Sequence, residues 1–177
     1  MPKQKKIKHN KKRKKTSLLF RILQSQQQQL LIALVLISCL LLATIIFIPP
    51  KIPDDRPERI NAYFEKYNMP LLGHGQAFVD AADTCGMDWR LLPAIAVRES
   101  SGGKHMQLNN PFGWGSAKIP FESIDDAIAG VGMNLCGFNT NTAKWYSTTS
   151  TYKKLYYYNG TVMPTYPDEV IWIMDQF

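Results

Sequence analysis

The hydrophobic positions of residues 58–177 recur with helical spacing. In the first stretch Ile60, Phe64 and Tyr67 lie three or four residues apart, a spacing that places side chains on one face of a helix. No stretch of any length alternates polar and apolar residues as a strand would. The pattern therefore predicts an all-α domain with long polar loops over 101–120 and 139–151. The expected helices cover residues 58–68, 75–86, 91–100, 123–138 and 166–177.

Residues that commonly begin or end helices stand at several of these boundaries. Gly86 is a natural C-terminal residue for the second helix. Asp88 suits an N-cap for the third, and Ser123 suits an N-cap for the fourth. Asp125 and Asp126 follow in the first turn of the fourth helix, where the helix dipole favours negative charge.

A different pattern fills residues 30–48, which are nineteen consecutive residues without a charge. This length approaches the roughly 20 residues that cross a hydrocarbon core. The segment ends without the small-residue site at which a signal peptide is cleaved. Residues 36–39 resemble a lipoprotein processing site at Cys39, but apolar residues follow the cysteine where a polar tether is expected. We therefore interpret residues 30–48 as an uncleaved transmembrane signal anchor.

The net charge of +7 is concentrated at one end of the chain. Residues 1–29 hold ten of the 21 basic residues and no acidic residue. Such a flank orients a membrane segment with its basic side in the cytoplasm. The expected organisation is a disordered cytoplasmic tail (1–29), a single transmembrane helix (30–48), a linker (49–57) and an extracytoplasmic domain (58–177).

This charge distribution also bears on the partners of the domain. Acidic residues outnumber basic residues after residue 29, so no nucleic-acid partner is expected for the folded domain. The tail alone could contact nucleic acid or anionic lipid. Cys85 and Cys136 could form a disulfide outside the cytoplasm or remain two buried thiols, and the sequence leaves both alternatives open.

A single glutamate ends the apolar run of residues 91–100. Glu99 follows Leu92 by seven positions and Ile95 by four, so it continues their apolar stripe. It also lies in the last helical turn, where the dipole disfavours negative charge. Burial and dipole both favour the protonated form, which a general acid of glycoside cleavage needs. The alternative is a surface glutamate that pairs with Arg98 or Lys104.

The residues after Glu99 have the chemistry of a saccharide groove. Amide and hydroxyl side chains can hydrogen-bond sugar hydroxyls, and an aromatic ring can pack on a pyranose ring. Trp114, Trp145 and the tyrosines of residues 156–158 are the aromatic candidates. The small residues 100–103 are expected to leave room for a sugar chain beside Glu99. Each aromatic could equally belong to the core.

Three stretches resemble the lysozyme-like domains of lytic transglycosylases and related bacterial peptidoglycan glucosaminidases. Residues 81–103 resemble the helix whose terminal Glu-Ser carries the catalytic acid. Residues 109–115 resemble the Asn-x-Phe-Gly loop of the glucosaminidase branch. Residues 157–174 resemble the late Tyr-Asn-x-Gly element, followed by a helix, of the transglycosylase branch. The resemblance implies a lysozyme-like fold.

The chain also departs from the transglycosylase pattern. Residues 110–114 stand where that pattern has a Gly-Leu-Met-Gln segment, and the Tyr-Asn-Gly run is one residue shorter than the family form. No cofactor is expected, and the histidines show no metal-ligand spacing. The resemblance assigns catalysis to Glu99 and substrate binding to Ser100, Asn110, Phe112, Trp114, Tyr158 and Asn159.

The resemblance implies an enzyme that cuts peptidoglycan glycan strands between amino sugars. A single glutamate can protonate the glycosidic oxygen and then accept a proton from the 6-hydroxyl of the sugar, which leaves a 1,6-anhydro product. Hydrolysis is the other possible outcome, and Glu122 is the candidate second carboxylate. A non-catalytic wall-binding or scaffold protein with a degenerate groove is the alternative function.

Overall fold

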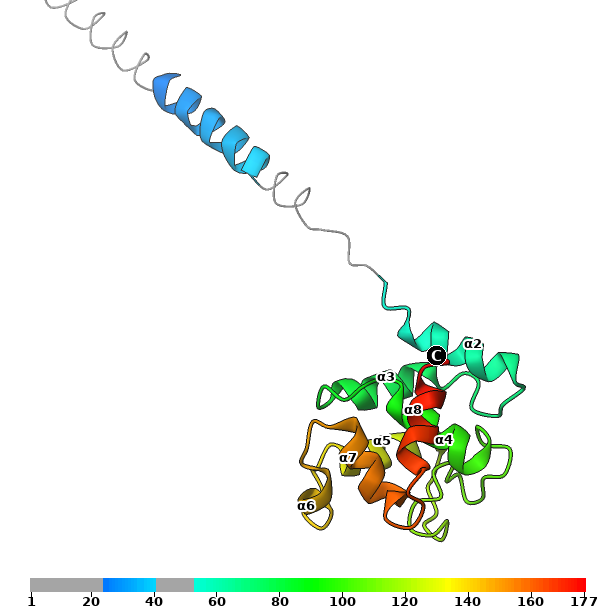
Figure 1. The fold of residues 1–177 in the computed structure, drawn as a ribbon. Coiled ribbons are helices and arrows are strands. Elements are labelled where there is room, and N and C mark those ends of the chain that lie inside the picture. Colours follow the sequence, from blue (N-terminus) through cyan, green and yellow to red (C-terminus); the bar gives the residue numbers. More distant parts are fainter. Residues whose placement is uncertain (1–23, 41–52) are drawn as a thin grey trace, which may run out of the picture. The chain divides into compact units, whose positions relative to one another are not determined.

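The computed structural model describes residues 24–40 and 53–177 (Figure 1). The chain divides into two units, Met1–Ile52 and Pro53–Phe177. The described residues contain helices and loops, and their only β-type pairing is an isolated bridge between Gln107 and Asn110. This architecture confirms the all-α prediction.

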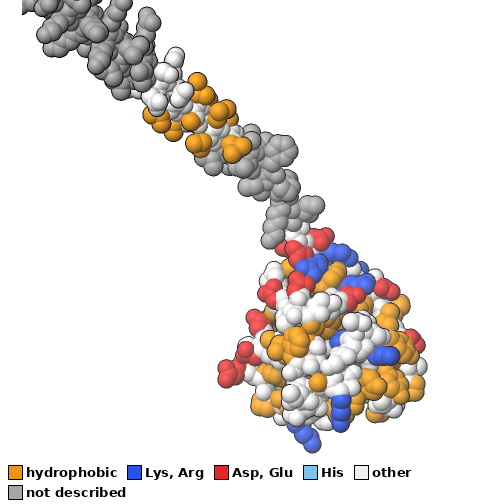
Figure 2. Space-filling model, turned by 90° about the vertical axis from the view of Figure 1, so that its left-hand side faces the viewer, with side chains coloured by type: hydrophobic (Ala, Val, Ile, Leu, Met, Phe, Trp, Pro, Cys, Tyr) orange, Lys and Arg blue, Asp and Glu red, His pale blue; other side chains and the backbone are white. Residues whose placement is uncertain are grey.

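In the first unit, residues 24–40 form one helix with exposed side chains, most of them hydrophobic from residue 30 onward (Figure 2). Residues 24–29, which were predicted to belong to the tail, are helical in the structure. Their glutamines are good helix formers and extend the apolar helix toward the N-terminus. Residues 1–23 of the tail and 41–48 of the predicted span lie outside the described residues. Within the described residues no helix is both long and apolar enough to cross a membrane.

The second unit begins its first helix inside the predicted linker. This helix starts at Arg56, with Pro57 in its first turn. Backbone N–H groups of the first turn have no partner within the helix, so the missing N–H of proline costs no hydrogen bond there. Residues 53–55 alone are non-helical in the described part of the linker. The helices are α2 (Arg56–Lys66), α3 (Gly75–Asp83), α4 (Leu91–Ser100), α5 (Ile124–Leu135), α6 (Ala143–Tyr146), α7 (Thr151–Leu155), the π-helix η1 (Tyr156–Gly160) and α8 (Tyr166–Met174).

The predicted helix ends are partly confirmed. Ser123 caps α5, because its hydroxyl accepts a hydrogen bond from the backbone N–H of Asp126 at 3.1 Å. Asp88 is not the cap of α4, which begins after Arg90. The Asp88 carboxylate instead accepts the N–H of Arg90 and pairs with its guanidinium at 2.8 Å. Asp88 therefore stabilises the turn that leads into α4.

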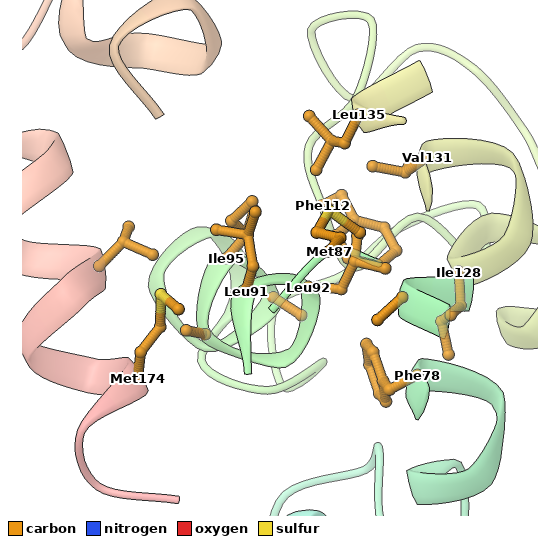
Figure 3. Packing of buried hydrophobic residues seen from close by; sticks show 14 of the residues in the cluster. Phe78, Met87, Leu91, Leu92, Ile95, Phe112, Ile128, Val131, Leu135 and Met174 are labelled. Carbon is orange, nitrogen blue, oxygen red and sulfur yellow. The ribbon is translucent and has the colours of Figure 1, made fainter. Parts of the chain in front are cut away.

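Helix α4 lies at the centre of the domain. Leu91, Leu92, Ala94, Ile95 and Ala96 are fully buried, so the helix is covered on nearly all sides and the predicted single apolar stripe was too narrow. Met174 of α8 lies on one side of α4, and residues of α3 and α5 lie on the other (Figure 3). Full burial of each large apolar side chain contributes roughly 1.5–3 kcal/mol. Helix α4 is therefore a rigid support for the residue at its end.

A disulfide connects the ends of two helices that pack together. Cys85 follows α3 and Cys136 follows α5, and their sulfurs are bonded across 51 residues of sequence. The structure thus selects the disulfide from the two alternatives that the sequence left open. The bond fixes α3 against α5 on the side of α4 that Figure 3 shows packed by Phe78 and Ile128.

The first helix of the domain is held at its start and again along its length. At the start of α2, the Arg56 guanidinium binds Asp83 of α3 at 2.7 Å and also binds Asp54. Farther along, Arg59 donates to the backbone oxygen of Phe177, whose ring lies 4.4 Å from that of Tyr63. The end of the chain therefore packs against α2.

Candidate active site

Glu99 is held in the last turn of α4, where it is half-buried. The helix ends because Ser101 adopts a left-handed conformation, with φ of 53°, and two glycines with positive φ follow it. These glycines do not border a sugar path as the sequence suggested. Gly102 and Gly103 are buried, and a Cβ at Gly102 would clash with the side chain of Met69. They allow the chain to turn tightly against residues 69–71.

Both carboxylate oxygens of Glu99 have close neighbours. The hydroxyl of Tyr166 donates a hydrogen bond to Oε1 at 2.6 Å. Near the other oxygen, Oε2, a Cβ built on Gly113 would lie 3.3 Å away, so the backbone of the 107–121 loop passes close to the acid. Tyr166 was not among the predicted site residues. Its hydrogen bond fixes one oxygen of the carboxyl group at the edge of a cavity.

This cavity has a volume of about 460 Å³, within the range of small-ligand sites. It brings together five of the predicted site residues, and three small residues of the 107–121 loop complete its lining. The lining residues are Glu99, Phe112, Gly113, Trp114, Gly115, Ser116, Tyr158 and Asn159. Glu99 is the one acidic residue in this lining, and the predicted second carboxylate Glu122 is not part of it.

Asn110 shapes the loop and does not line the cavity. It is buried, and its Nδ2 donates to the backbone oxygens of Trp114 at 2.9 Å and Ile119 at 3.2 Å. Its Oδ1 accepts the N–H of Trp114 at 3.1 Å. One amide side chain thereby supplies the hydrogen bonds that a turn of several positive-φ residues cannot make internally.

Ser100 and Phe112 are also buried. The Ser100 hydroxyl lies 2.8 Å from the oxygen of Pro111 and accepts the N–H of Gly103 at 3.0 Å. It therefore ties the end of α4 to the loop. Phe112 belongs to the cavity lining, but its ring points into the core, where it lies 6.4 Å from the ring of Phe78.

Three aromatic rings pack together at the site, and two of them, those of Trp114 and Tyr158, belong to residues that line the cavity. Tyr158 is stacked on Tyr166, with centroids 5.9 Å apart and planes at 6°, and it also contacts Trp114 at 5.6 Å. Its hydroxyl donates to the oxygen of Phe112 at 2.7 Å. Burial, reinforced by the nearby charge of Glu99, raises the pKa of Tyr158 and of Tyr166. Both phenols therefore remain protonated donors at neutral pH.

The surface-glutamate alternative is not supported, because the two basic residues proposed as partners are engaged elsewhere. The Arg98 guanidinium binds Glu169 of α8 at 2.7 Å, and the Lys104 ammonium donates to the oxygen of Tyr67. Hydrogen bonds from Thr165 and Arg98 lower the pKa of Glu169. The ion pair of Arg98 connects α4 to α8 beside the contact between Glu99 and Tyr166.

Trp145 lies outside the cavity. Its ring is exposed on α6, with the Lys144 ammonium 4.1 Å from its centroid. Among the described residues, no three His, Cys, Asp or Glu side chains are grouped so that they could hold a metal ion. The functional groups of the cavity lining are one carboxyl group, one phenol, a serine hydroxyl, an amide and aromatic faces.

Comparisons with known proteins give no relative for this chain. It matches no protein-family model. Neither the curated proteins nor the solved structures contain a match.

Proposed function

We propose that this protein is a membrane-anchored, lysozyme-like enzyme that cleaves glycosidic bonds between the amino sugars of peptidoglycan. In this proposal residues 30–48 span the cell membrane, the N-terminus is cytoplasmic and the Pro53–Phe177 unit faces the wall. One observation carries the proposal. The carboxyl group of Glu99 lines an aromatic cavity and is held there by the Tyr166 hydroxyl.

The lining suits a saccharide better than a highly charged ligand. Trp114 and Tyr158 offer aromatic faces, while Asn159 and Ser116 offer an amide and a hydroxyl for sugar hydroxyls and acetamido groups. The two glycines of the loop bring backbone close to the cavity without side chains. Only one charged group, Glu99, is present in this lining.

The proposed reaction uses Glu99 twice. The protonated acid gives its proton to the glycosidic oxygen as the bond from that oxygen to C1 breaks, and the leaving sugar departs with a new hydroxyl. The resulting carboxylate then accepts a proton from the 6-hydroxyl as that oxygen bonds to C1, or from a water that attacks C1. The first route yields a 1,6-anhydro end and the second a reducing end. The Tyr166 hydroxyl stabilises the carboxylate between the two transfers.

The test compares two glutamates of different placement. Full-length protein in mild detergent is incubated with purified peptidoglycan sacculi, and the release of soluble fragments is measured. Glu99→Gln is expected to lower the rate at least about 100-fold, because it removes the general acid. Glu122→Gln is the matched control, since Glu122 is exposed and outside the cavity lining, and it is expected to retain the wild-type rate.

Each outcome has a distinct meaning. Equal rates for Glu99→Gln and the wild type would exclude Glu99 as the acid. Wild-type protein that binds sacculi and releases nothing would support the alternative of a non-catalytic wall-binding or scaffold protein. Mass spectrometry of the fragments separates the two routes, since an anhydro product lacks one water relative to a hydrolytic product.

A further inference from the structure

The part of the domain that carries α6, α7 and η1 differs in charge from the rest. All fourteen acidic residues of the chain lie outside residues 127–167, which contain three lysines. Of these lysines, Lys154 is buried and donates to the backbone oxygens of Leu135 and Tyr146, whereas Lys144 and Lys153 are exposed. The surface over α6 and α7 therefore carries positive charge in a domain that is otherwise acidic.

The continuous helix formed by α7 and η1 has two sides of different character. Lys154, Leu155 and Tyr158 face inward, and Tyr158 continues into the cavity lining. Tyr152 and Tyr156 belong to the opposite side, where the N–H of Tyr156 bonds the oxygen of Tyr152 one helical turn earlier.

The outer side carries a group of exposed tyrosine rings. The exposed fractions of Tyr152, Tyr156 and Tyr157 are 47%, 45% and 42%. The rings of Tyr156 and Tyr157 lie 5.5 Å apart at 72°, so the two adjacent rings present an edge and a face. Lys153, which lies between Tyr152 and Tyr156 in the sequence, is exposed as well. We call these four residues, Tyr152, Lys153, Tyr156 and Tyr157, the tyrosine face.

We propose that the tyrosine face is a second saccharide-binding surface, outside the cleavage cavity, that holds an amino-sugar polymer bearing carboxylate groups. The proposal rests on the proposed function and extends it to the length and charge of the substrate. Tyrosine rings pack on sugar rings. Lys153, together with Lys144 on the neighbouring helix α6, complements carboxylates such as those of peptide side branches.

Continuity with the cavity favours a glycan strand as the occupant. Tyr157 of the tyrosine face immediately precedes Tyr158 in η1, and Tyr158 and Asn159 line the cavity. In this proposal a strand that leaves the cavity passes around η1 to the exposed rings on the outer side of the same helix. A membrane surface is a poorer fit, because interfacial helices present Leu, Phe or Trp with several basic residues, whereas this segment is rich in threonine, serine and tyrosine.

The test measures binding separately from cleavage. Full-length Glu99→Gln protein in detergent is titrated against pelleted peptidoglycan sacculi, so that the probe is not consumed. Replacing Tyr152, Tyr156 and Tyr157 together by Ala is expected to weaken binding at least about tenfold, given the contribution of each ring. Replacement of the same three by Phe keeps the rings and is expected to retain binding within about threefold. Tyr67→Ala is the control, because Tyr67 is also 42% exposed but lies at the end of α2.

A second measurement does not depend on substitution. Nitration of tyrosines in the Glu99→Gln chain, read by mass spectrometry, should be slowed at Tyr152, Tyr156 and Tyr157 by sacculi and unchanged at Tyr67. Unchanged nitration and unchanged binding of the alanine variant would overturn the inference. Protection by phosphatidylglycerol vesicles without any sacculi would overturn it in favour of a membrane contact.

These outcomes also separate the inference from the proposed function. If sacculi protect the tyrosines but wild-type protein releases no fragments, the binding surface stands and the proposed cleavage fails. If fragments are released without protection, the inference alone fails. The alanine variant with Glu99 intact should still cleave a short soluble amino-sugar oligomer at the wild-type rate, because such an oligomer needs only the cavity.

Discussion

Tyr166 gives the candidate acid a fixed hydrogen-bond donor. Its hydroxyl lies 2.6 Å from Oε1 of Glu99, and its ring is buried at the first turn of α8. Burial and the charge of Glu99 raise the pKa of Tyr166, so the phenol keeps its proton over the pH range in which a carboxyl group ionises. In the proposed reaction it is a positioning residue that acts through Glu99.

We expect Tyr166→Phe to lower kcat about tenfold or more with KM changed less than about twofold. The loss follows because a hydrogen bond to a charged group contributes about 1.5–3 kcal/mol, and the ring that packs on Tyr158 is kept. Steady-state kinetics on a soluble peptidoglycan fragment provides the measurement, with Tyr63→Phe as a control on α2. A parallel fall in melting temperature and a rise in KM would indicate a structural role instead.

Some residues of the candidate site were predicted from the sequence and others were missed. The difference is whether the pattern that reveals a residue lies close to it in the sequence. Glu99 was predictable because the apolar run before it lies within one helix. Its partner Tyr166 is 67 residues away, and only the packing of α4 on α8 brings them together. Ser100 and Asn110 have side chains suited to sugars, but in tight turns such side chains satisfy nearby backbone groups.

At the scale of elements, the 107–121 loop depends on Asn110. We expect Asn110→Ala to lower the free energy of unfolding by about 1–3 kcal/mol, because the backbone groups of Trp114 and Ile119 lose their hydrogen bonds to a buried amide. Release of fragments from sacculi should fall as well, since Trp114 and Gly113 lose their fixed positions in the cavity wall. Urea unfolding measures the first effect, and Asn141→Ala, an exposed loop change, is the control. Stability equal to the wild type would show that the loop keeps its conformation without the Asn110 side chain.

Helix prediction succeeded where the apolar pattern was long. Helix α4 occupies the predicted residues, and α3, α5 and α8 lie within their predicted ranges but end three residues early. Helix α6 was predicted to be loop, because four residues are too few to show a period. The π-helix η1 has no periodic signature either, although it sends Tyr158 inward and leaves Tyr157 outside.

At the scale of the whole domain, the disulfide between Cys85 and Cys136 constrains the unfolded chain. We expect the double substitution Cys85→Ser with Cys136→Ser to lower the free energy of unfolding by about 4 kcal/mol, from the chain entropy of a loop of this length. Neither cysteine lines the cavity, so fragment release well below the melting temperature should be preserved. Thermal unfolding and sacculus digestion of the same preparation test both parts. Loss of activity in a fully folded variant would contradict the expectation that the disulfide does not affect the cavity.

If the domain is tethered to a membrane as proposed, the ion pairs at the start of α2 have a mechanical consequence. Arg56 binds Asp54 just before the helix and Asp83 at the end of α3. If the wall moves relative to the membrane while a strand is bound, tension along the linker reaches the domain at this point. The guanidinium passes that load sideways into α3, and the disulfide after α3 carries it on to α5. The start of α2 is thereby secured to α3 and, through the disulfide, to α5.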